Sequence, residues 1–331
     1  MQGSADFELY SARMDLNFLL WLQNFRNSTG DFLTPAMELV SQLAVGGVSI
    51  ALLALVYWCL DKRAGLWLLM NTGLCSVVNS LIKLTACVYR PWVKNPAIVP
   101  AGNALETATG YSFPSGHVTR ATALFGGLAV LQWRRKWLAG IFALIVLLVM
   151  LSRNYLGVHT PQDVLAALLV TALLMAANWK LLTWLDRKNE AKFLAAGLLL
   201  TLACLLYFSL KSYPEDFVDG RLLVDPEAMK NDSFANLGMF AGLCVGTFCE
   251  RRFVSFEVAG SWRRKLLRFV IGLVPLLAWA MLAKCFLYGI FGEHAGRFLY
   301  GFAPSFYVLA LYPMIFKGFE RRIFRSSQAA A

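Results

Sequence analysis

Residues 137–153 read WLAGIFALIVLLVMLSR, an apolar run that ends in a serine and an arginine. An α-helix needs about 20 predominantly apolar residues to cross a bilayer, so this run approaches the length of one membrane span. The whole chain has the same character, because 58% of its 331 residues are hydrophobic and only 15% are charged. Soluble domains carry about a quarter of charged residues. The sequence therefore predicts an all-α fold, a polytopic transmembrane helical bundle.

Similar apolar runs recur along the chain and predict about nine spans, at residues 36–60, 64–88, 116–133, 137–153, 161–184, 193–210, 233–249, 267–290 and 297–316. We expect a disordered start at residues 1–13. Residues 16–25 are apolar but too short to span, so we expect an N-terminal interfacial helix along the membrane surface. No cleavable signal peptide is expected, because no basic segment is followed by a short apolar core and a small-residue cleavage site.

The basic residues predict which side of the membrane each loop faces. If nine helices alternate in direction, 19 of the 31 Lys and Arg residues fall on one side, which the positive-inside rule makes cytoplasmic. They are Lys62, Arg63, Arg134, Arg135, Lys136, Lys180, Arg187, Lys188, Lys192, Arg251, Arg252, Arg263, Arg264, Lys265, Arg268, Lys317, Arg321, Arg322 and Arg325. The amino terminus and the acidic loop at 211–232 are then extracytoplasmic. The membrane is expected to be a bacterial inner membrane, or that of the endoplasmic reticulum in a eukaryote.

Three sets of polar residues interrupt the apolar sequence, all on the predicted extracytoplasmic side. The first is Lys83 with Arg90-Pro91. Lys83 and Arg90 are two helical turns apart and share a face, while Pro91 disfavours helix at Arg90 and directs it into the loop. The alternative is that both cations only anchor a helix end at the headgroups.

The second set is Pro114-Ser115-Gly116-His117, directly before a predicted span. Ser115 is expected to cap that helix, and Gly116 lets the backbone approach an anion closely. Exposed N–H groups at a helix start bind phosphate, and His117 in the first turn points at the same place. The alternative is a capping turn with an incidental histidine.

The third set joins two spans and holds Arg153, Gly157, His159 and Asp163. Arg153 offers a planar fork that matches phosphate oxygens. Thr160-Pro161-Gln162-Asp163 predicts a helix start with Thr160 as its cap. Asp163 is placed to accept the ring N–H of His159 and so make the other ring nitrogen a better nucleophile. A plain capping role for Asp163 is the alternative, and both roles are compatible.

Together the sets supply three permanent cations, two histidines, one carboxylate and a turn glycine. Ionisable groups in membrane segments are costly, so a shared cavity at the helix ends is the expectation. These residue types suit a site that grips a phosphate and breaks its ester bond. The net charge of +11 does not indicate nucleic-acid binding, because no soluble basic face with interleaved aromatic residues occurs. The seven cysteines lack metal-ligand spacing.

The three sets resemble the pattern of the type 2 phosphatidic acid phosphatase (PAP2) superfamily: Lys, six residues, Arg-Pro; Pro-Ser-Gly-His; and Ser-Arg, three residues, Gly, one residue, His, three residues, Asp. Every position matches, from Lys83 to Pro91, Pro114 to His117 and Ser152 to Asp163. The resemblance implies that His159 attacks phosphorus and forms a phosphohistidine, that Asp163 orients it, and that His117 protonates the leaving oxygen. It also implies that Lys83, Arg90, Ser115, Gly116 and Arg153 bind the phosphate, with no metal or other cofactor.

The expected domains are an N-terminal segment at 1–35, a PAP2-type catalytic core at 36–190, and C-terminal helices at 191–331 that complete the bundle. Nine spans with an exterior amino terminus look like the glucose-6-phosphatase and sphingosine-1-phosphate phosphatase branches. The hypothesis is a metal-independent phosphatase for the phosphomonoester or pyrophosphate of a lipid or lipid-linked substrate. A sugar-phosphate phosphatase, a lipid phosphotransferase and an anion-binding transporter or scaffold remain alternatives. The sequence does not indicate an oligomeric state.

Overall fold

The computed structural model describes residues 2–108, 110–218 and 221–319. The chain forms two compact units that interleave along the sequence. Unit 1 comprises Met1–Gly46, Val78–Met175 and Ser212–Met229, and unit 2 comprises Gly47–Val77, Ala176–Lys211 and Lys230–Ala331. Helices α4 (Lys62–Ala86), α9 (Pro161–Leu185) and α11 (Pro226–Cys249) each pass from one unit into the other. The domain boundaries predicted from the sequence, at 35/36 and 190/191, stay predictions.

Seven helical segments of the described residues are long and apolar enough to cross a membrane, and each coincides with a predicted span. They are Thr34–Leu60, Lys62–Lys94, Lys136–Tyr155, Pro161–Leu185, Glu190–Leu210, Trp262–Lys284 and Phe286–Phe319. The prediction of a multi-pass helical membrane protein is therefore confirmed. The other two predicted spans are also helical, but one runs only from Gly116 to Leu131 and the other begins among the charged residues of α11. The number nine stays a prediction.

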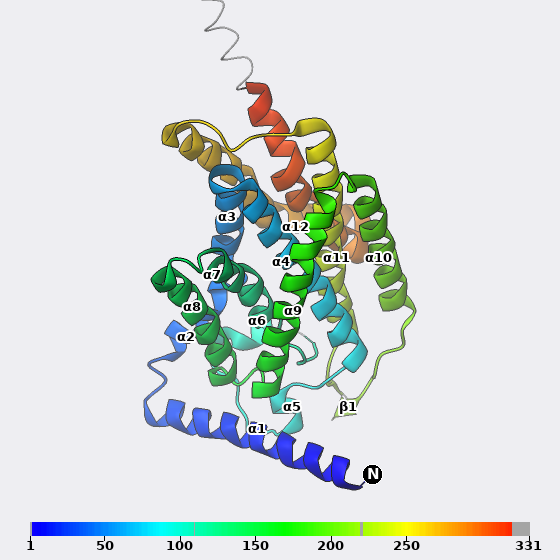
Figure 1. Cartoon of the computed structure of the whole chain (residues 1–331). Helices are drawn as coiled ribbons and strands as arrows, with labels where there is room; N and C mark the ends of the chain where they lie inside the picture. The colour runs from blue at the N-terminus through cyan, green and yellow to red at the C-terminus, as the bar shows by residue number, and fades with distance from the viewer. Residues whose placement is uncertain (1, 109, 219–220, 320–331) are drawn as a thin grey trace, which may run out of the picture. The chain divides into compact units, whose positions relative to one another are not determined.

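The first described element of unit 1 is α1 (Gln2–Ser28), so the disordered start predicted at 1–13 is wrong for residues 2–13, and Met1 lies outside the described residues. That stretch has no proline and only one glycine, and nothing in it ends a helix. Figure 1 shows α1 running across the end of α8 (Lys136–Tyr155). The buried Arg26 fixes this contact, since its guanidinium donates to the backbone carbonyls of Tyr155 at 3.4 Å and Val99 at 2.9 Å. The rings of Phe18, Trp21 and Phe25 stack on an exposed face, as an interfacial helix requires.

The remaining elements of unit 1 surround α8. Helix α2 (Thr34–Leu43) packs against it, and α6 (Gly116–Ala121), η3 (Thr122–Gly126) and α7 (Gly127–Leu131) form a second layer. The same unit holds the short helices α5 (Pro91–Lys94) and η2 (Gly102–Thr107), of which η2 packs against α2. Alanines of the η2 segment pack on Tyr155, Leu156 and Val158, so the loop after α8 has an apolar support. A hairpin of β1 (Phe217–Val218) and β2 (Arg221–Leu222) precedes α11.

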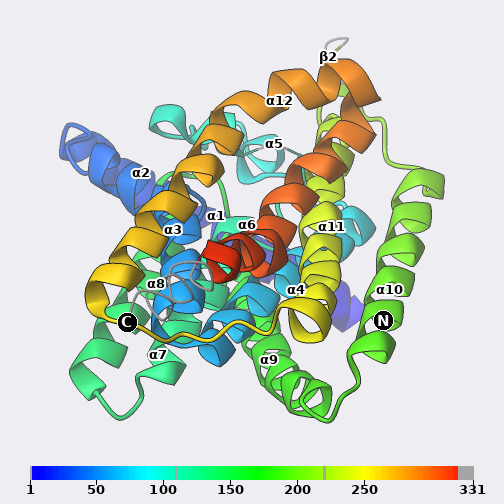
Figure 2. The same ribbon diagram turned by 90° about the horizontal axis from the view of Figure 1, so that it is seen from above.

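In unit 2, helix α11 packs closely on the second half of α12 (Trp262–Phe306), as Figure 2 shows. Gly238, Gly242 and Gly246 recur every four residues on α11, and a Cβ at Gly238 would lie 1.9 Å from the carbonyl oxygen of Phe298. Small residues at this spacing let two helix backbones approach closely. Helix α12 is interrupted at Gly292, where φ is 73°, and this break separates the two spans predicted at 267–290 and 297–316.

The other elements of unit 2 are α3 (Gly47–Leu55), η1 (Val56–Leu60), α10 (Glu190–Leu210), η4 (Glu250–Val254) and η5 (Tyr307–Leu311), after which the helix continues to Phe319. The fully buried Trp58 donates its indole N–H to the carbonyl of Val308 at 2.8 Å. Helix α10 packs on α11, because a Cβ at Gly197 would meet the Sγ of Cys244. The predicted basic tail residues Arg321, Arg322 and Arg325 lie outside the described residues.

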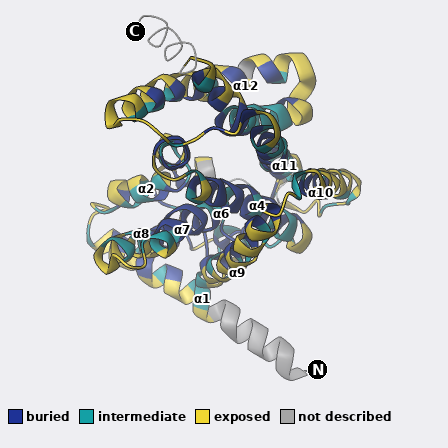
Figure 3. Cartoon of the chain, turned by 45° about the horizontal axis from the view of Figure 1, so that its top comes forward, coloured by how far each residue is buried: buried dark blue, intermediate teal, exposed yellow. Residues whose placement is uncertain are grey.

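Large apolar side chains remain exposed along single faces of the helices. On α8 the exposed residues are Trp137, Ile141, Leu144, Leu147 and Leu151, which follow the helical period. Figure 3 shows similar exposed stretches on α10. Apolar stripes of this length are rare on soluble monomers, and lipid is the solvent that suits them. The buried face of α8 instead carries polar residues at its carboxyl end, Ser152, Arg153 and Asn154.

Candidate active site

All eight predicted site residues fall in unit 1, in three stretches of chain. Helix α4 ends at Ala86, and Arg90 stands in extended conformation directly before α5, as Pro91 predicts. The guanidinium of Arg90 donates through Nε to Gly110 at 3.0 Å and through Nη1 to Val158 at 2.9 Å, both backbone carbonyls. Lys83 is buried in the last turn of α4, and its Nζ donates to the carbonyl of Tyr111 at 3.2 Å. Both cations therefore hold the loops that carry the other motifs.

Helix α6 begins at Gly116, as predicted, with Ser115 at the capping position. The prediction that the Ser115 side chain caps this helix is wrong, because its hydroxyl makes no capping hydrogen bond. Within the described residues the buried Ser115 Oγ has no hydrogen-bond partner, and neither has Nε2 of His117. Buried polar atoms are normally paired, so two such atoms at one helix start are available to a ligand.

Arg153 lies at the carboxyl end of α8 and is only 1% exposed. Its Nη1 donates to the hydroxyl of Ser41 on α2 at 2.7 Å. Its Nε and Nη2 have no hydrogen-bond partner in the part of the chain that the structure describes. A buried guanidinium with two unpaired N–H groups is costly, and an anion with oxygens in a plane would relieve that cost.

His159 is 1% exposed and lies between two ionic partners. Its Nε2 is 3.0 Å from Nη1 of Arg90, and its Nδ1 is 3.4 Å from Oδ2 of Asp163. A guanidinium can only donate, so Nε2 must be the acceptor and the ring proton sits on Nδ1, toward the carboxylate. This tautomer leaves the lone pair of Nε2 facing the cation that would bind the phosphate.

The charge state of His159 follows from the same surroundings. Burial lowers the pKa of His159 well below its usual value, Arg90 lowers it further, and Asp163 partly opposes both through a hydrogen bond and its charge. The imidazole is therefore neutral near pH 7, and a neutral imidazole is the form that can attack phosphorus.

Asp163 makes the contacts that both expected roles require. Oδ2 accepts the backbone N–H of Thr160 at 2.8 Å, and the backbone N–H of Asp163 donates to Oγ1 of Thr160 at 3.3 Å. This reciprocal pair is the predicted capping of α9, which begins at Pro161. The same oxygen faces Nδ1 of His159, so the helix cap also fixes the orientation of the histidine.

Three polar residues of the site were not predicted. Ser112 donates its hydroxyl to Oδ2 of Asp163 at 2.5 Å and lies 3.4 Å from Nδ1 of His159. Asn154 donates to the carbonyl of His159 at 2.8 Å, and Asn79 donates to the carbonyl of Pro114 at 3.2 Å. The sequence could have suggested two of them by their closeness to the motifs, since Ser112 precedes the second motif by two residues and Asn154 follows Ser152-Arg153 directly.

The motifs come together around the two histidines. The permanent charges of Arg153, Arg120 and Arg90 all act on the ring of His117. The backbone N–H of Ser115 donates to the carbonyl of Asp163 at 3.1 Å, which joins the second motif to the third. Of the eight residues, Arg153 lines a cavity toward α2, described below, and His159 does not line it. Among the described residues, no group of three histidine, cysteine or acidic side chains could hold a metal ion.

Two family models match the chain over most of these elements. Residues 64–189, which include all eight site residues, match the PAP2 superfamily, and residues 234–322 match the transmembrane extension of PAP2 superfamily phosphatases. The Escherichia coli (strain K12) protein YbjG, whose name places it with the undecaprenyl-diphosphatases, is 31% identical over 159 residues, 46% of this chain and 77% of that protein. The chain belongs to the PAP2 superfamily. It is a membrane-embedded phosphatase of that superfamily.

Other members of the superfamily are similar over shorter lengths. Undecaprenyl-diphosphatase BcrC of Bacillus subtilis (strain 168) is 30% identical over 148 residues, 43% of this chain and 71% of that protein. Human sphingosine-1-phosphate phosphatase 2 is 29% identical over 147 residues, 43% of this chain but only 36% of the human protein. No solved structure matches the chain significantly.

Proposed function

We propose that this PAP2 superfamily phosphatase removes phosphate from a lipid or lipid-linked phosphomonoester or diphosphate, through a phosphohistidine at His159. The observation that carries this proposal is the setting of the His159 ring, with Arg90 at Nε2 and Asp163 at Nδ1. That setting supports Nε2 as the nucleophile, because the ring proton is on Nδ1, toward Asp163. The names of its relatives refer to undecaprenyl diphosphate and sphingosine 1-phosphate, which supports a lipid as the substrate.

In the first half-reaction, Nε2 of His159 forms a bond to phosphorus while the ester P–O bond breaks. The electron pair of that bond leaves with the alcohol oxygen, which takes a proton from His117. The phosphorylated imidazole then carries a positive charge, which the carboxylate of Asp163 stabilises across Nδ1–H. Arg90, Arg153 and Lys83, with the Ser115 hydroxyl and the Gly116 amide, stabilise the charge on the equatorial oxygens.

In the second half-reaction, His117 takes a proton from a water molecule whose oxygen attacks the same phosphorus. The N–P bond breaks, its electron pair returns to Nε2, and inorganic phosphate leaves. His117 must be protonated at the start, although its burial and the neighbouring guanidinium groups disfavour a positive charge on its ring. The phosphate dianion brings negative charge to this place, and that charge favours the protonated imidazole.

The site is proposed to face the extracytoplasmic side. Support comes from the basic residues. If the nine predicted spans alternate in direction, 19 of the 31 Lys and Arg residues fall on the side of the membrane opposite the motif loops, and the positive-inside rule makes that side cytoplasmic. A site at helix ends stands at the level of lipid headgroups, so an amphiphile can present its phosphate without leaving the bilayer.

The test is release of inorganic phosphate by the purified protein from a panel of phosphatidic acid, a sphingoid-base phosphate, a prenyl diphosphate and glucose 6-phosphate. We expect turnover of lipids and none with His159→Ala. Turnover of glucose 6-phosphate alone would favour a sugar-phosphate phosphatase, and transfer to an alcohol in place of water would favour a phosphotransferase. Release from no ester, with phosphate still bound, would favour an anion-binding protein.

A further inference from the structure

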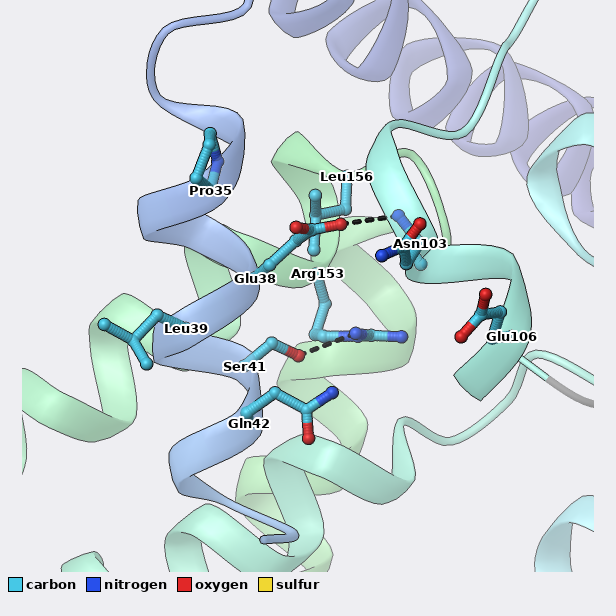
Figure 4. Close-up of a pocket in the computed structure, with 10 residues that line it drawn as sticks. Pro35, Glu38, Leu39, Ser41, Gln42, Asn103, Glu106, Arg153 and Leu156 are labelled. Atoms are coloured by element: carbon cyan, nitrogen blue, oxygen red, sulfur yellow. Dashed lines mark hydrogen bonds between the residues drawn. The ribbon is translucent and has the colours of Figure 1, made fainter.

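A cavity of about 360 Å³ lies beside Arg153 in unit 1. Helix α2 forms one wall, η2 forms the other, and the carboxyl end of α8 closes it (Figure 4). Ligand pockets begin at about 300 Å³, so this volume fits a polar headgroup and leaves no room for a long hydrocarbon chain. The polar residues that line it are Glu38, Ser41, Gln42, Asn103, Glu106 and Arg153.

One end of the cavity is built for an anion. Figure 4 shows the guanidinium of Arg153 extending from α8 between Ser41 of α2 and Glu106 of η2. Arg153 is only 1% exposed, and its Nε and Nη2 have no hydrogen-bond partner among the described residues. A buried cation with unpaired N–H groups beside a cavity marks the position of a negatively charged ligand group.

The two walls have the opposite charge. Glu38 stands on α2, where Oε1 accepts the backbone N–H of Asn103 at 2.5 Å, and Glu106 stands on η2. Their carboxylates outnumber the one guanidinium in the cavity lining. Once a phosphate dianion binds Arg153, it neutralises the one cation of the cavity lining, and the carboxylates of Glu38 and Glu106 dominate the rest of the cavity. A second phosphate is then repelled, whereas a cationic group is attracted.

We propose that this cavity is the leaving-group subsite, and that Glu38 and Glu106 select a phosphomonoester whose alcohol carries an ammonium group beside it, as in an amino alcohol. The subsite discriminates against a diphosphate, whose leaving group is a second anion. The side-chain amides of Gln42 and Asn103 supply hydrogen bonds to hydroxyls of the same headgroup. This inference rests on the proposed function and separates two substrate classes that the relatives leave open.

The test compares wild type, Glu38→Gln, Glu106→Gln and the double variant on three substrates in mixed micelles. They are a sphingoid-base 1-phosphate with a free ammonium, phosphatidic acid with a neutral leaving group, and a prenyl diphosphate with an anionic one. Glu215→Gln, an exposed carboxylate of the 211–216 segment, is the matched control. N-acylation of the sphingoid-base phosphate removes its positive charge and provides a control on the substrate side.

We expect wild type to prefer the ammonium substrate over the diphosphate, and N-acylation to abolish that preference. Each single variant should lower kcat/KM for the ammonium substrate about three- to fivefold, as loss of a partly exposed charge pair predicts. The double variant should lose about tenfold there, stay within about twofold on phosphatidic acid, and gain on the diphosphate. Glu106 is exposed, so Glu106→Gln remains a usable variant if the change at Glu38 disturbs folding.

Equal losses on all three substrates, or no change on any, would overturn the subsite proposal while leaving the proposed function standing. A wild-type preference for the diphosphate that the double variant keeps would also overturn it. Release of phosphate from none of the three by wild type would instead overturn the proposed function, and the subsite with it.

Discussion

Replacing Ser112 by alanine removes one hydrogen bond from the buried carboxylate of Asp163, which we propose orients the nucleophile His159. The hydroxyl donates to Oδ2 of Asp163 at 2.5 Å, and Ser112 is 1% exposed, so water cannot replace it. A hydrogen bond to a charged group contributes about 1.5–3 kcal/mol. Asp163 keeps the backbone N–H of Thr160, so the lower end applies. About 1.5 kcal/mol in the transition state corresponds to roughly a tenfold loss of kcat.

The assay is steady-state phosphate release by Ser112→Ala in detergent or nanodiscs, with kcat and KM determined separately. We expect the loss in kcat, with KM within about twofold of wild type, because Ser112 is not among the residues proposed to bind the phosphate. Ser112→Thr keeps a hydroxyl and should restore most activity. Ser305→Ala is the matched control, since this buried serine of unit 2 donates to the carbonyl of Gly301 in its own helix. A kcat for Ser112→Ala within twofold of wild type would refute the reasoning.

Three further predictions concern the histidines and the helix packing. His117→Ala should lose most turnover yet bind vanadate better than Arg153→Ala does, in a competition assay; equal losses of binding would remove the division of roles. Activity should fall with pH only below pH 6.5, because burial and Arg90 lower the pKa of His159 and protonation below that pKa removes the nucleophilic lone pair. A fall in kcat/KM that is centred at or above pH 6.5 would contradict this assignment. Gly238→Ala should lower stability by about 1–3 kcal/mol in thermal unfolding, because its Cβ would strike the backbone of Phe298. Gly289→Ala, with open space around it, should not destabilise, and similar losses for both would argue against this close helix contact.

Hydropathy was sufficient to predict the helices that face lipid, because apolar runs such as 137–153 need no tertiary information. The helix starts at Gly116 and Pro161 were equally predictable, since proline, glycine and capping residues act locally. The count of spans was less predictable. The helix that starts at Gly116 ends at Leu131, where Gln132 leaves helical geometry, so its apolar sequence does not reveal how far it extends.

The partners of the site residues depend on tertiary structure and left no local pattern. Ser112 meets Asp163 across 51 positions of sequence, and Ser41 meets Arg153 across 112. Ser115 has the sequence of a helix cap, yet its hydroxyl leaves the helix end uncapped. Sequence predicts which residues gather at one end of the bundle. Only the fold specifies which atoms of Arg90 and Asp163 face the two nitrogens of His159.

The most direct test of the central claim is to trap the covalent intermediate. Wild-type protein mixed briefly with a phosphate-labelled lipid substrate and quenched in alkaline denaturant should carry an acid-labile phosphate. Peptide mass spectrometry should locate this phosphate on His159, and His159→Ala should carry none and release no phosphate. A label on another residue, or turnover by His159→Ala at the wild-type rate, would contradict the proposed mechanism.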